Sequence, residues 1–267
     1  MISSHDEDRM RQIIEAKKPD EPPMPERLGE RDFPRKWSLN PTEAQKRLWA
    51  SQREQREKDA RDRMLLRQFR LGCGRRLDPW TTTIDSFELY EGDEGAWQKI
   101  VLDQVRDYIL ELPRHRKQGN GVFLIGAPGT GKDHLAVAVA REYILRLGCT
   151  ARRFFCPELK STLRDTYKNS GPTEGGILRP TLTPDVIILS DPVSIGSRLS
   201  DSQQELLLKI VDKRYMAKKP TIITANFNDE AEAKEKLGAQ VVDRLSHGSL
   251  RLFCNWESYR TRERRRK

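Results

Sequence analysis

The sequence predicts an α/β fold, in which a parallel five-stranded sheet is flanked by helices and preceded by a charged, helical arm. From residue 83 onward, short apolar runs alternate with longer amphipathic stretches. This alternation is typical of strands and helices that follow one another in a parallel sheet. The predicted strands are 121–126, 151–156, 185–190, 221–226 and 249–256.

Three helices are predicted after these strands. One begins at about Gly131 and ends at Leu147, a second follows 151–156 and runs through about Lys168, and a third is the long amphipathic stretch DSQQELLLKIVDKRYM. The stretch 169–184 is rich in Gly and Pro, which predicts a loop. No apolar run approaches the roughly 20 residues that cross a bilayer, so we expect no membrane span.

Charge divides the chain into three parts. The net charge is +9, yet residues 84–259 carry equal numbers of acidic and basic side chains, so the excess lies at the two ends. Basic segments favour nucleic acid as a partner because they release counterions from phosphates, although a solvated tail is the alternative for RTRERRRK. We therefore expect an arm at 1–76, a globular domain at 77–259 and a basic tail at 260–267.

The arm is predicted to contain a disordered stretch and one helix. Residues 1–40 are rich in Pro and charge, which predicts disorder, whereas 41–71 is predicted to be helical with Asn40 as its N-cap and Pro41 in its first position. Apolar residues lie at the two ends of this helix, and its middle is charged all round. It either crosses solvent to reach a partner or folds back at one end onto the main domain, and we expect the partner-binding arrangement.

A phosphate-binding loop follows the first predicted strand. The residues GAPGTGK fit the pattern G-x-x-x-x-G-K and lie between a strand and a helix, as this motif requires. Glycines allow backbone amides to surround a polyphosphate, and the lysine reaches the β- and γ-phosphates. The predicted nucleotide-binding residues are Gly126, Ala127, Pro128, Gly129, Thr130, Gly131, Lys132, Asp133 and His134.

Two positions depart from the usual magnesium-binding pattern. Asp133 stands where a Ser or Thr hydroxyl normally binds Mg²⁺, and Ser190 stands where a strand normally ends in Asp. We predict that the carboxylate and the hydroxyl have exchanged places, with Asp133 binding Mg²⁺ directly, Ser190 in the outer position and Asp191 beside them. The alternative is a weakened enzyme that binds nucleotide and hydrolyses it slowly. In that case Asp191 remains as the residue that orients the attacking water.

Three further residues are candidates for contact with the phosphates. Asn226 ends the fourth predicted strand and can hydrogen-bond a water near the γ-phosphate. Arg244 lies on a short helix beyond the sheet and could reach the nucleotide of a neighbouring subunit, whereas Arg260 could contact the phosphates of its own chain. Isolated arginines of this kind are also common in surface ion pairs.

Several blocks together resemble the bacterial helicase-loader family of the DnaC type, within the AAA+ initiator clade. The resemblance implies an AAA+ fold, with Lys132 as the P-loop lysine, Asn226 as sensor 1, Arg244 as the arginine finger and Arg260 as the sensor-2 arginine. It also implies ATP and Mg²⁺ as cofactors. The blocks that carry the resemblance are GAPGTGKDHLA, RDTYKNSG, VDKRYMAKKPTIITAN, LGAQVVDRL and FCNWESYRTR.

A DNA-binding site is expected on the helix that precedes NSG. Lys160, Arg164 and Lys168 recur every four residues on one helix face, and Tyr167 lies beside them. Positive charge with one stacking ring suits single-stranded DNA. The resemblance implies the same partner here, while an ordinary solvated helix face is the alternative.

The resemblance implies a cytoplasmic protein whose arm binds the replicative helicase, and whose AAA+ domain forms an ATP-dependent homo-oligomer that holds DNA during helicase loading. ATP hydrolysis to ADP and phosphate is expected to be slow or stimulated by DNA. One alternative is an ATPase helper of transposition of the IstB type, which would bind duplex DNA and a transposase. The other is a nucleotide-sensing scaffold without useful turnover.

Overall fold

The computed structural model describes residues 42–156, 174–193 and 197–266. The predicted disorder at 1–40 and the predicted DNA-binding helix lie outside these ranges. The chain divides into two compact units, residues 1–52 and 53–267, and the candidate site belongs entirely to the second. That unit starts earlier than the predicted domain boundary at residue 77 and includes most of helix α2, Glu43–Arg70.

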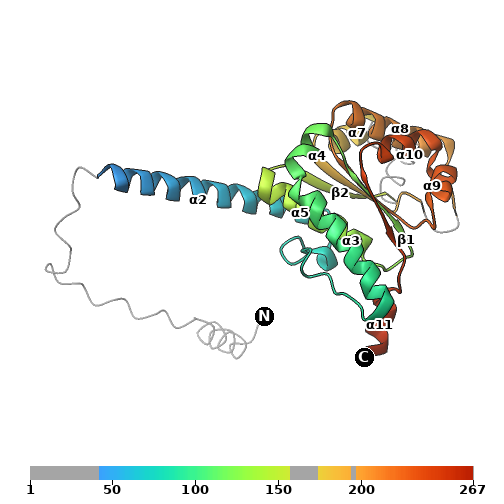
Figure 1. Cartoon of the computed structure of the whole chain (residues 1–267). Helices are drawn as coiled ribbons and strands as arrows, with labels where there is room; N and C mark the ends of the chain where they lie inside the picture. Colours follow the sequence, from blue (N-terminus) through green and yellow to red (C-terminus); the bar gives the residue numbers. More distant parts are fainter. Residues whose placement is uncertain (1–41, 157–173, 194–196, 267) are drawn as a thin grey trace, which may run out of the picture. The chain divides into compact units, whose positions relative to one another are not determined.

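A five-stranded parallel sheet forms the centre of the second unit, as the sequence predicts (Figure 1). The strand order is β2-β3-β4-β1-β5, so β1, which leads into the phosphate-binding loop, lies between β4 and β5. The strands are β1 Val122–Gly126, β2 Ala151–Phe155, β3 Val186–Ser190, β4 Thr221–Ala225 and β5 Leu250–Cys254.

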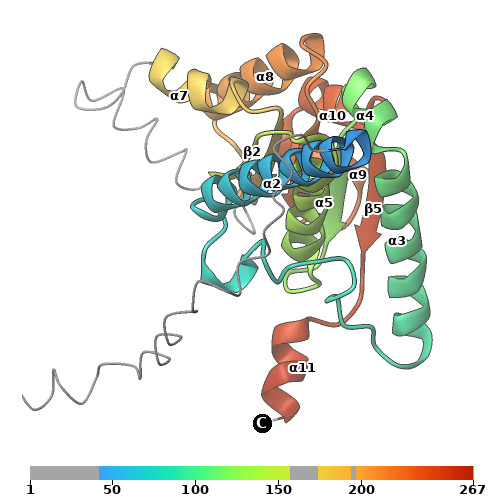
Figure 2. The ribbon, with the colours of Figure 1, turned by 90° about the vertical axis from the view of Figure 1, so that its left-hand side faces the viewer.

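Side chains of the central strands alternate between two hydrophobic cores. On one face, residues such as Leu124 and Ile188 pack against the helices 92–110 and 132–147 and against the last turns of α2. On the other face, residues such as Phe123 and Leu189 pack against the helices 201–216, 230–237 and 239–246. The central strands β1, β3 and β4 are fully buried, which explains why they read as continuous apolar runs. Figures 1 and 2 show the sheet between these helices.

Helices cover both faces of the sheet. The predicted helix after the phosphate-binding loop is confirmed, and so is the long helix after β3. The pair α3 and α4 lies in a region to which the sequence analysis assigned no element. The helices besides α2 are α3 Gly92–Leu110, α4 Leu112–Gln118, α5 Lys132–Leu147, α7 Glu174–Leu182, α8 Asp201–Met216, α9 Glu230–Leu237, α10 Ala239–Ser246 and α11 Tyr259–Arg266, with a short 3₁₀ turn η1 Arg75–Leu77.

The predicted loop at 169–184 is wrong over the residues of α7. Pro180 lies inside this helix, and the partly buried Leu178 packs against the core that also contains α8. The side chain of Lys219 and the buried guanidinium of Arg214 bond backbone carbonyls at the end of α7. Tertiary packing and these bonds therefore stabilise a helix in a sequence whose Gly and Pro content argues against one.

Helix α2 begins with a capping box at Thr42, two residues later than the predicted cap Asn40. The backbone N–H of Gln45 donates to Thr42 Oγ1, and the backbone N–H of Thr42 donates to Gln45 Oε1. Side chains 42–61 are exposed, whereas Leu65, Leu66 and Phe69 belong to the core that packs against α5. The end of this helix is therefore part of the globular unit. No helix among the described residues has the length and apolar content needed to cross a membrane.

Candidate nucleotide-binding site

The loop between β1 and α5 has the backbone geometry of a phosphate cradle. Gly129 and Gly131 have φ angles of 81° and 88°, in the region that side chains disfavour. A Cβ on Gly129 would lie 2.0 Å from Ser258 Oγ, and one on Gly131 would lie 2.6 Å from the Phe87 ring. Glycine is therefore required at both positions, and the loop leads directly into the N-terminus of α5, where backbone N–H groups favour anions. These residues fit a bound polyphosphate.

Lys132 is fixed within this loop. Its ammonium donates to the carbonyl oxygens of Gly126 and Ala127, at 2.9 Å and 2.6 Å, and lies 3.5 Å from Thr130 Oγ1. The side chain is buried, and burial lowers its pKa because the charged form loses solvation. The ammonium thus lies inside the curve of the loop, where a polyphosphate would replace carbonyl oxygens as its partner.

The C-terminal segment NWESYR holds the loop in place. The indole N–H of Trp256 donates to the Thr130 carbonyl at 2.9 Å, and the backbone N–H of Tyr259 donates to the Gly129 carbonyl at 2.9 Å. The Trp256 ring is buried and meets Phe87 edge to face. This segment, which belongs to one of the blocks that carry the family resemblance, therefore supports the phosphate loop through two of its carbonyls. The sequence alone did not predict this structural role.

His134 connects the loop helix to the segment that precedes α3. Its Nε2 lies 2.8 Å from the Thr83 carbonyl and 3.3 Å from Ser86 Oγ, while Phe87 packs edge to face against its ring. Because a carbonyl can only accept, Nε2 carries the proton and donates to it. Burial lowers the pKa of His134, so its neutral form is favoured in the folded chain. His134 is thus a packing residue of the site.

The two exchanged residues of the magnesium pattern lie in contact. Ser190 Oγ donates to Asp133 Oδ1 at 3.0 Å, and Thr224 Oγ1 donates to the same oxygen at 2.6 Å. Asp133 Oδ2 pairs with the guanidinium of Arg153 at 2.8 Å, and Arg153 Nε donates to Ser190 Oγ at 2.9 Å. Asp133, Ser190 and Thr224 therefore form one network with Arg153, a residue of β2 that the sequence analysis did not single out.

As long as Asp133 is paired with Arg153, its carboxylate is not available to bind Mg²⁺ directly. Both oxygens of Asp133 already accept hydrogen bonds, and one of them holds a guanidinium, which repels a second cation. Among the described residues, no group of three or more His, Cys, Asp or Glu side chains gathers as a metal site. The role of Asp133 as a metal ligand stays a prediction, and the ion pair with Arg153 argues against it.

Asp191 and Asn226 lie together at the ends of neighbouring strands. Asn226 Nδ2 donates to Asp191 Oδ1 at 2.7 Å, and Asp191 has an unusual φ of 50°. Burial, followed by the charge of Asp133, raises the pKa of Asp191. A half-buried carboxylate held by an amide in this way has the chemistry to orient a water molecule beside a phosphate.

The two candidate arginines differ in their surroundings. Arg244 pairs with Asp212 at 3.2 Å and with Asp243 at 2.9 Å, and its guanidinium lies over the Tyr215 ring. It would have to leave these partners to reach a neighbouring subunit. Arg260 is exposed at the start of α11, directly after Tyr259, whose backbone N–H donates to the Gly129 carbonyl. The backbone of Arg260 therefore lies next to the phosphate loop.

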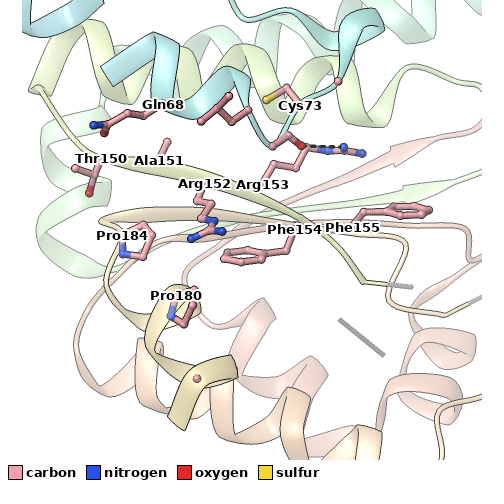
Figure 3. Close-up of a pocket in the computed structure, with 14 residues that line it drawn as sticks. Gln68, Cys73, Thr150, Ala151, Arg152, Arg153, Phe154, Phe155, Pro180 and Pro184 are labelled. Atoms are coloured by element: carbon pink, nitrogen blue, oxygen red, sulfur yellow. Dashed lines mark hydrogen bonds between the residues drawn. The ribbon is translucent and has the colours of Figure 1, made fainter. Parts of the chain in front are cut away.

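A pocket of about 1000 Å³ lies along the edge strand β2, and it contains no residue of the phosphate loop. In Figure 3, Arg152 and Phe154 lie on one side of β2, whereas Arg153 lies on the other, toward Cys73 and the end of α2. Lys160, Arg164, Tyr167 and Lys168, the predicted DNA-binding residues, lie outside the described residues. The structure therefore gives no geometry for them.

Comparisons with known proteins agree with this architecture. A family model described as "IstB-like ATP binding protein" matches residues 53–267. The replicative helicase loader DnaC of Escherichia coli (strain K12) is 35% identical over 182 residues, which cover 66% of this chain and 69% of that protein. The crystal structure of the DnaC helicase loader superposes with a TM-score of 0.55 at 27% identity, covering 67% of this chain and 99% of that one.

The crystal structure of DnaI has a TM-score of 0.51 at 18% identity over 66% of this chain and 89% of that one, which supports the fold alone. The family model spans the whole second unit, and the similarity to DnaC extends over most of it. The phosphate loop, the parallel sheet and these matches agree. The chain belongs to the IstB-like ATP-binding protein family and has an AAA+ domain of the DnaC type.

Proposed function

We propose that this chain binds ATP and a replicative DNA helicase and helps to load that helicase onto DNA. The observation that carries the proposal is the 35% identity to a replicative helicase loader, in a chain whose phosphate loop has the geometry that nucleotide binding needs. The backbone N–H groups at the start of α5 and the ammonium of Lys132 would hold the polyphosphate.

Hydrolysis is proposed to be slow. Asp191 and Asn226 would orient the attacking water, and Arg260 would contact the phosphates in the same chain. Arg244 would act on the nucleotide of a neighbouring subunit, which requires it to exchange Asp212 and Asp243 for phosphate oxygens. Turnover would then depend on assembly into an ATP-dependent homo-oligomer, since no single chain supplies every charge that the transition state needs.

The exchanged residues are tested by restoring the usual pattern. The double variant Asp133→Thr with Ser190→Asp places the hydroxyl and the carboxylate where an active P-loop ATPase has them. If the natural arrangement is a working one, phosphate release will be equal to or slower than that of the natural chain. A large gain in turnover would show that the chain is a weakened enzyme, and a turnover assay with and without single-stranded DNA separates it from a scaffold.

The arm is proposed as the element that binds the helicase. Mixing the full chain with the replicative helicase of its host, with and without ATP, should give a stoichiometric complex whose mass can be measured in solution. Deleting residues 1–52 should abolish this complex and leave the second unit folded, because its core begins beyond this point. Deleting residues 1–76 is a poorer test, since it removes Leu65, Leu66 and Phe69 from that core.

The absence of a complex with a folded, hexameric helicase would favour the IstB-like alternative. The family model that matches residues 53–267 carries that name, and such a protein would bind duplex DNA and a transposase. For the loader, single-stranded DNA binding is tested by replacing Arg164 and Lys168 with Ala together. Weaker binding with a flatter salt dependence is expected, because two phosphate contacts are lost. Unchanged affinity and salt slope would remove this site from the proposal.

A further inference from the structure

Arg153 links three elements around the phosphate loop. Its guanidinium pairs with Asp133 of α5 at 2.8 Å, donates to Ser190 of β3 at 2.9 Å, and lies 3.5 Å from the carbonyl of Gly72, just after α2. Figure 3 shows this last contact as a dashed line, with Arg153 on the side of β2 opposite Arg152.

The position of Arg153 is fixed by close packing. Its side chain is 10% exposed, and a Cβ added to Gly72 would lie 2.8 Å from the Arg153 carbonyl oxygen. The chain after α2 therefore approaches the backbone of β2 so closely that only glycine fits at position 72. The guanidinium itself is held by its burial and by its bonds to Asp133, Ser190 and the Gly72 carbonyl. A charge held in this way acts without the entropy cost of ordering a free side chain.

The electrostatics of the site require a cation at this point. Asp133 follows the phosphate-loop lysine directly, so its unpaired carboxylate would repel an incoming polyphosphate. In a site with a Ser or Thr hydroxyl at this position, no carboxylate is present, and the Mg²⁺ that the hydroxyl binds offsets the negative charge of the phosphates. In this chain, Arg153 already pairs with Asp133, and Ser190 stands at the end of β3 where a carboxylate is usual, so Asp191 is the carboxylate that remains there.

We propose that Arg153 is a built-in cation that takes over the electrostatic role of Mg²⁺ at Asp133, so that this chain binds nucleoside triphosphate with little dependence on divalent cations. The inference rests on the proposed nucleotide binding and adds its ion requirement. Arg153 is a positioning residue in this account, because it acts on the nucleotide through Asp133.

The test is a titration of the full chain with a fluorescent ATP analogue, once in excess Mg²⁺ and once in EDTA. For the natural chain the two Kd values should agree within about 3-fold, which corresponds to less than 1 kcal/mol. In Arg153→Met, the unpaired Asp133 repels the phosphates unless Mg²⁺ binds to it. The Kd in EDTA should then exceed the Kd in Mg²⁺ by about 10-fold or more.

Two control variants separate charge from folding. Arg152→Met removes an arginine from the opposite side of the same strand, where it lies over the Phe154 ring, and should keep the small natural ratio. Arg153→Lys keeps the charge and should stay closer to the natural chain than Arg153→Met. Thermal unfolding of each variant establishes that it is folded under the conditions of the titration.

The natural chain alone can overturn the inference. If its affinity falls about 10-fold or more in EDTA, Arg153 does not replace the metal, while nucleotide binding stands. Equal ratios in Arg153→Met and the natural chain would likewise overturn it. If the natural chain binds no nucleotide in either solution, the proposed function fails together with this inference.

Discussion

At the scale of single residues, Arg214 is a buried arginine that forms no ion pair with a carboxylate among the described residues. Arg214 is fully buried and donates to Thr221 Oγ1 and to four backbone carbonyls, those of Thr181, Pro184, Asp185 and Pro220. Burial lowers its pKa to about 9. The guanidinium thus joins the end of α7 to the starts of β3 and β4. It stabilises the fold by donating hydrogen bonds to buried carbonyl groups.

Replacing this residue should be costly. Arg214→Met keeps much of the side-chain volume but leaves four carbonyls without a donor, so we expect a loss of about 3 kcal/mol or more in the free energy of unfolding. Urea unfolding of the purified variant measures this directly. Lys213→Met, at an exposed neighbouring position of α8, should change stability by less than about 0.5 kcal/mol. Similar values for the two variants would show that the carbonyls find other donors.

The lowered pKa of His134 leads us to expect that the stability of the fold depends on pH. Burial lowers this pKa below the ordinary value of 6.5, so in acid the unfolded chain takes up this proton before the folded chain does. Stability should therefore fall as the pH drops below about 6.5. His134→Gln can still donate to the Thr83 carbonyl and should show a shallower fall between pH 7.5 and pH 5.5 in thermal unfolding. A variant with the same pH slope as the natural chain would contradict this assignment.

At the scale of elements, the phosphate loop is shaped by chain segments far from it in sequence. Trp256 and Tyr259 bond its carbonyls from the end of the chain, and Phe87 packs against Gly131 from the segment before α3. Tyr90 connects the two outer segments, because its hydroxyl donates to the Glu257 carbonyl and its ring lies under the Arg262 guanidinium. The loop is thus held in shape from both sides.

The indole hydrogen bond can be removed without removing the ring. Trp256→Phe should cost about 1 kcal/mol of stability, since the Thr130 carbonyl loses its donor, and should weaken nucleotide binding a few-fold because the loop is less ordered. Chemical denaturation and nucleotide titration give the two numbers. Trp97→Phe, at a position that is 63% exposed on α3, serves as the matched control and should change neither. An unaltered nucleotide affinity in Trp256→Phe would show that the bond stabilises only the fold.

At the scale of the whole molecule, the end of α2 belongs to the AAA+ core. Leu65, Leu66 and Phe69 are buried in the same hydrophobic core as α3 and α5, and the chain then turns at Gly72 against β2. The chain just after this helix, at Gly72, therefore lies within hydrogen-bond distance of Arg153, which itself pairs with Asp133 of the candidate nucleotide site.

The packing of this helix end predicts a clear stability difference. Phe69→Ala removes a ring that is 1% exposed and should lower the free energy of unfolding by about 3–5 kcal/mol, because it leaves a cavity. Met64→Ala, at a position that is 52% exposed, should cost less than about 0.5 kcal/mol. Equal effects in urea unfolding would mean that the helix end does not pack as described.

The elements that carry the strongest local patterns could be predicted from the sequence. The buried strands β1, β3 and β4 are apolar throughout, and the phosphate loop with α5 follows from the glycine spacing. Helix α7 could not be predicted, because its Gly and Pro content opposes a helix that only packing and the side chains of Arg214 and Lys219 stabilise.

Some residues of the candidate site could likewise be predicted from the sequence, and others could not. Lys132, Asp133, Ser190, Asp191 and Asn226 could be named from motif spacing, because each lies at a fixed distance from a strand end. Asp133 follows β1 and Ser190 ends β3, and β4, whose Thr224 bonds the same carboxylate, lies between these two strands. The contribution of Arg153 could not be predicted, since β2 reads as an ordinary edge strand and nothing in ARRFF states which arginine turns inward.

The fold class, the phosphate loop and the family follow from the amino-acid sequence, because they depend on residues that are close together in the chain or at characteristic spacings. Which charges meet depends on how the elements pack in three dimensions. Residues that are distant in sequence meet in the Arg153–Asp133 pair, in the bonds of Arg214 to the carbonyls of Thr181, Pro184 and Asp185, and in the bond of Trp256 to the loop. The energies of these contacts depend on distance and burial, which the chain acquires only when its strands and helices pack together.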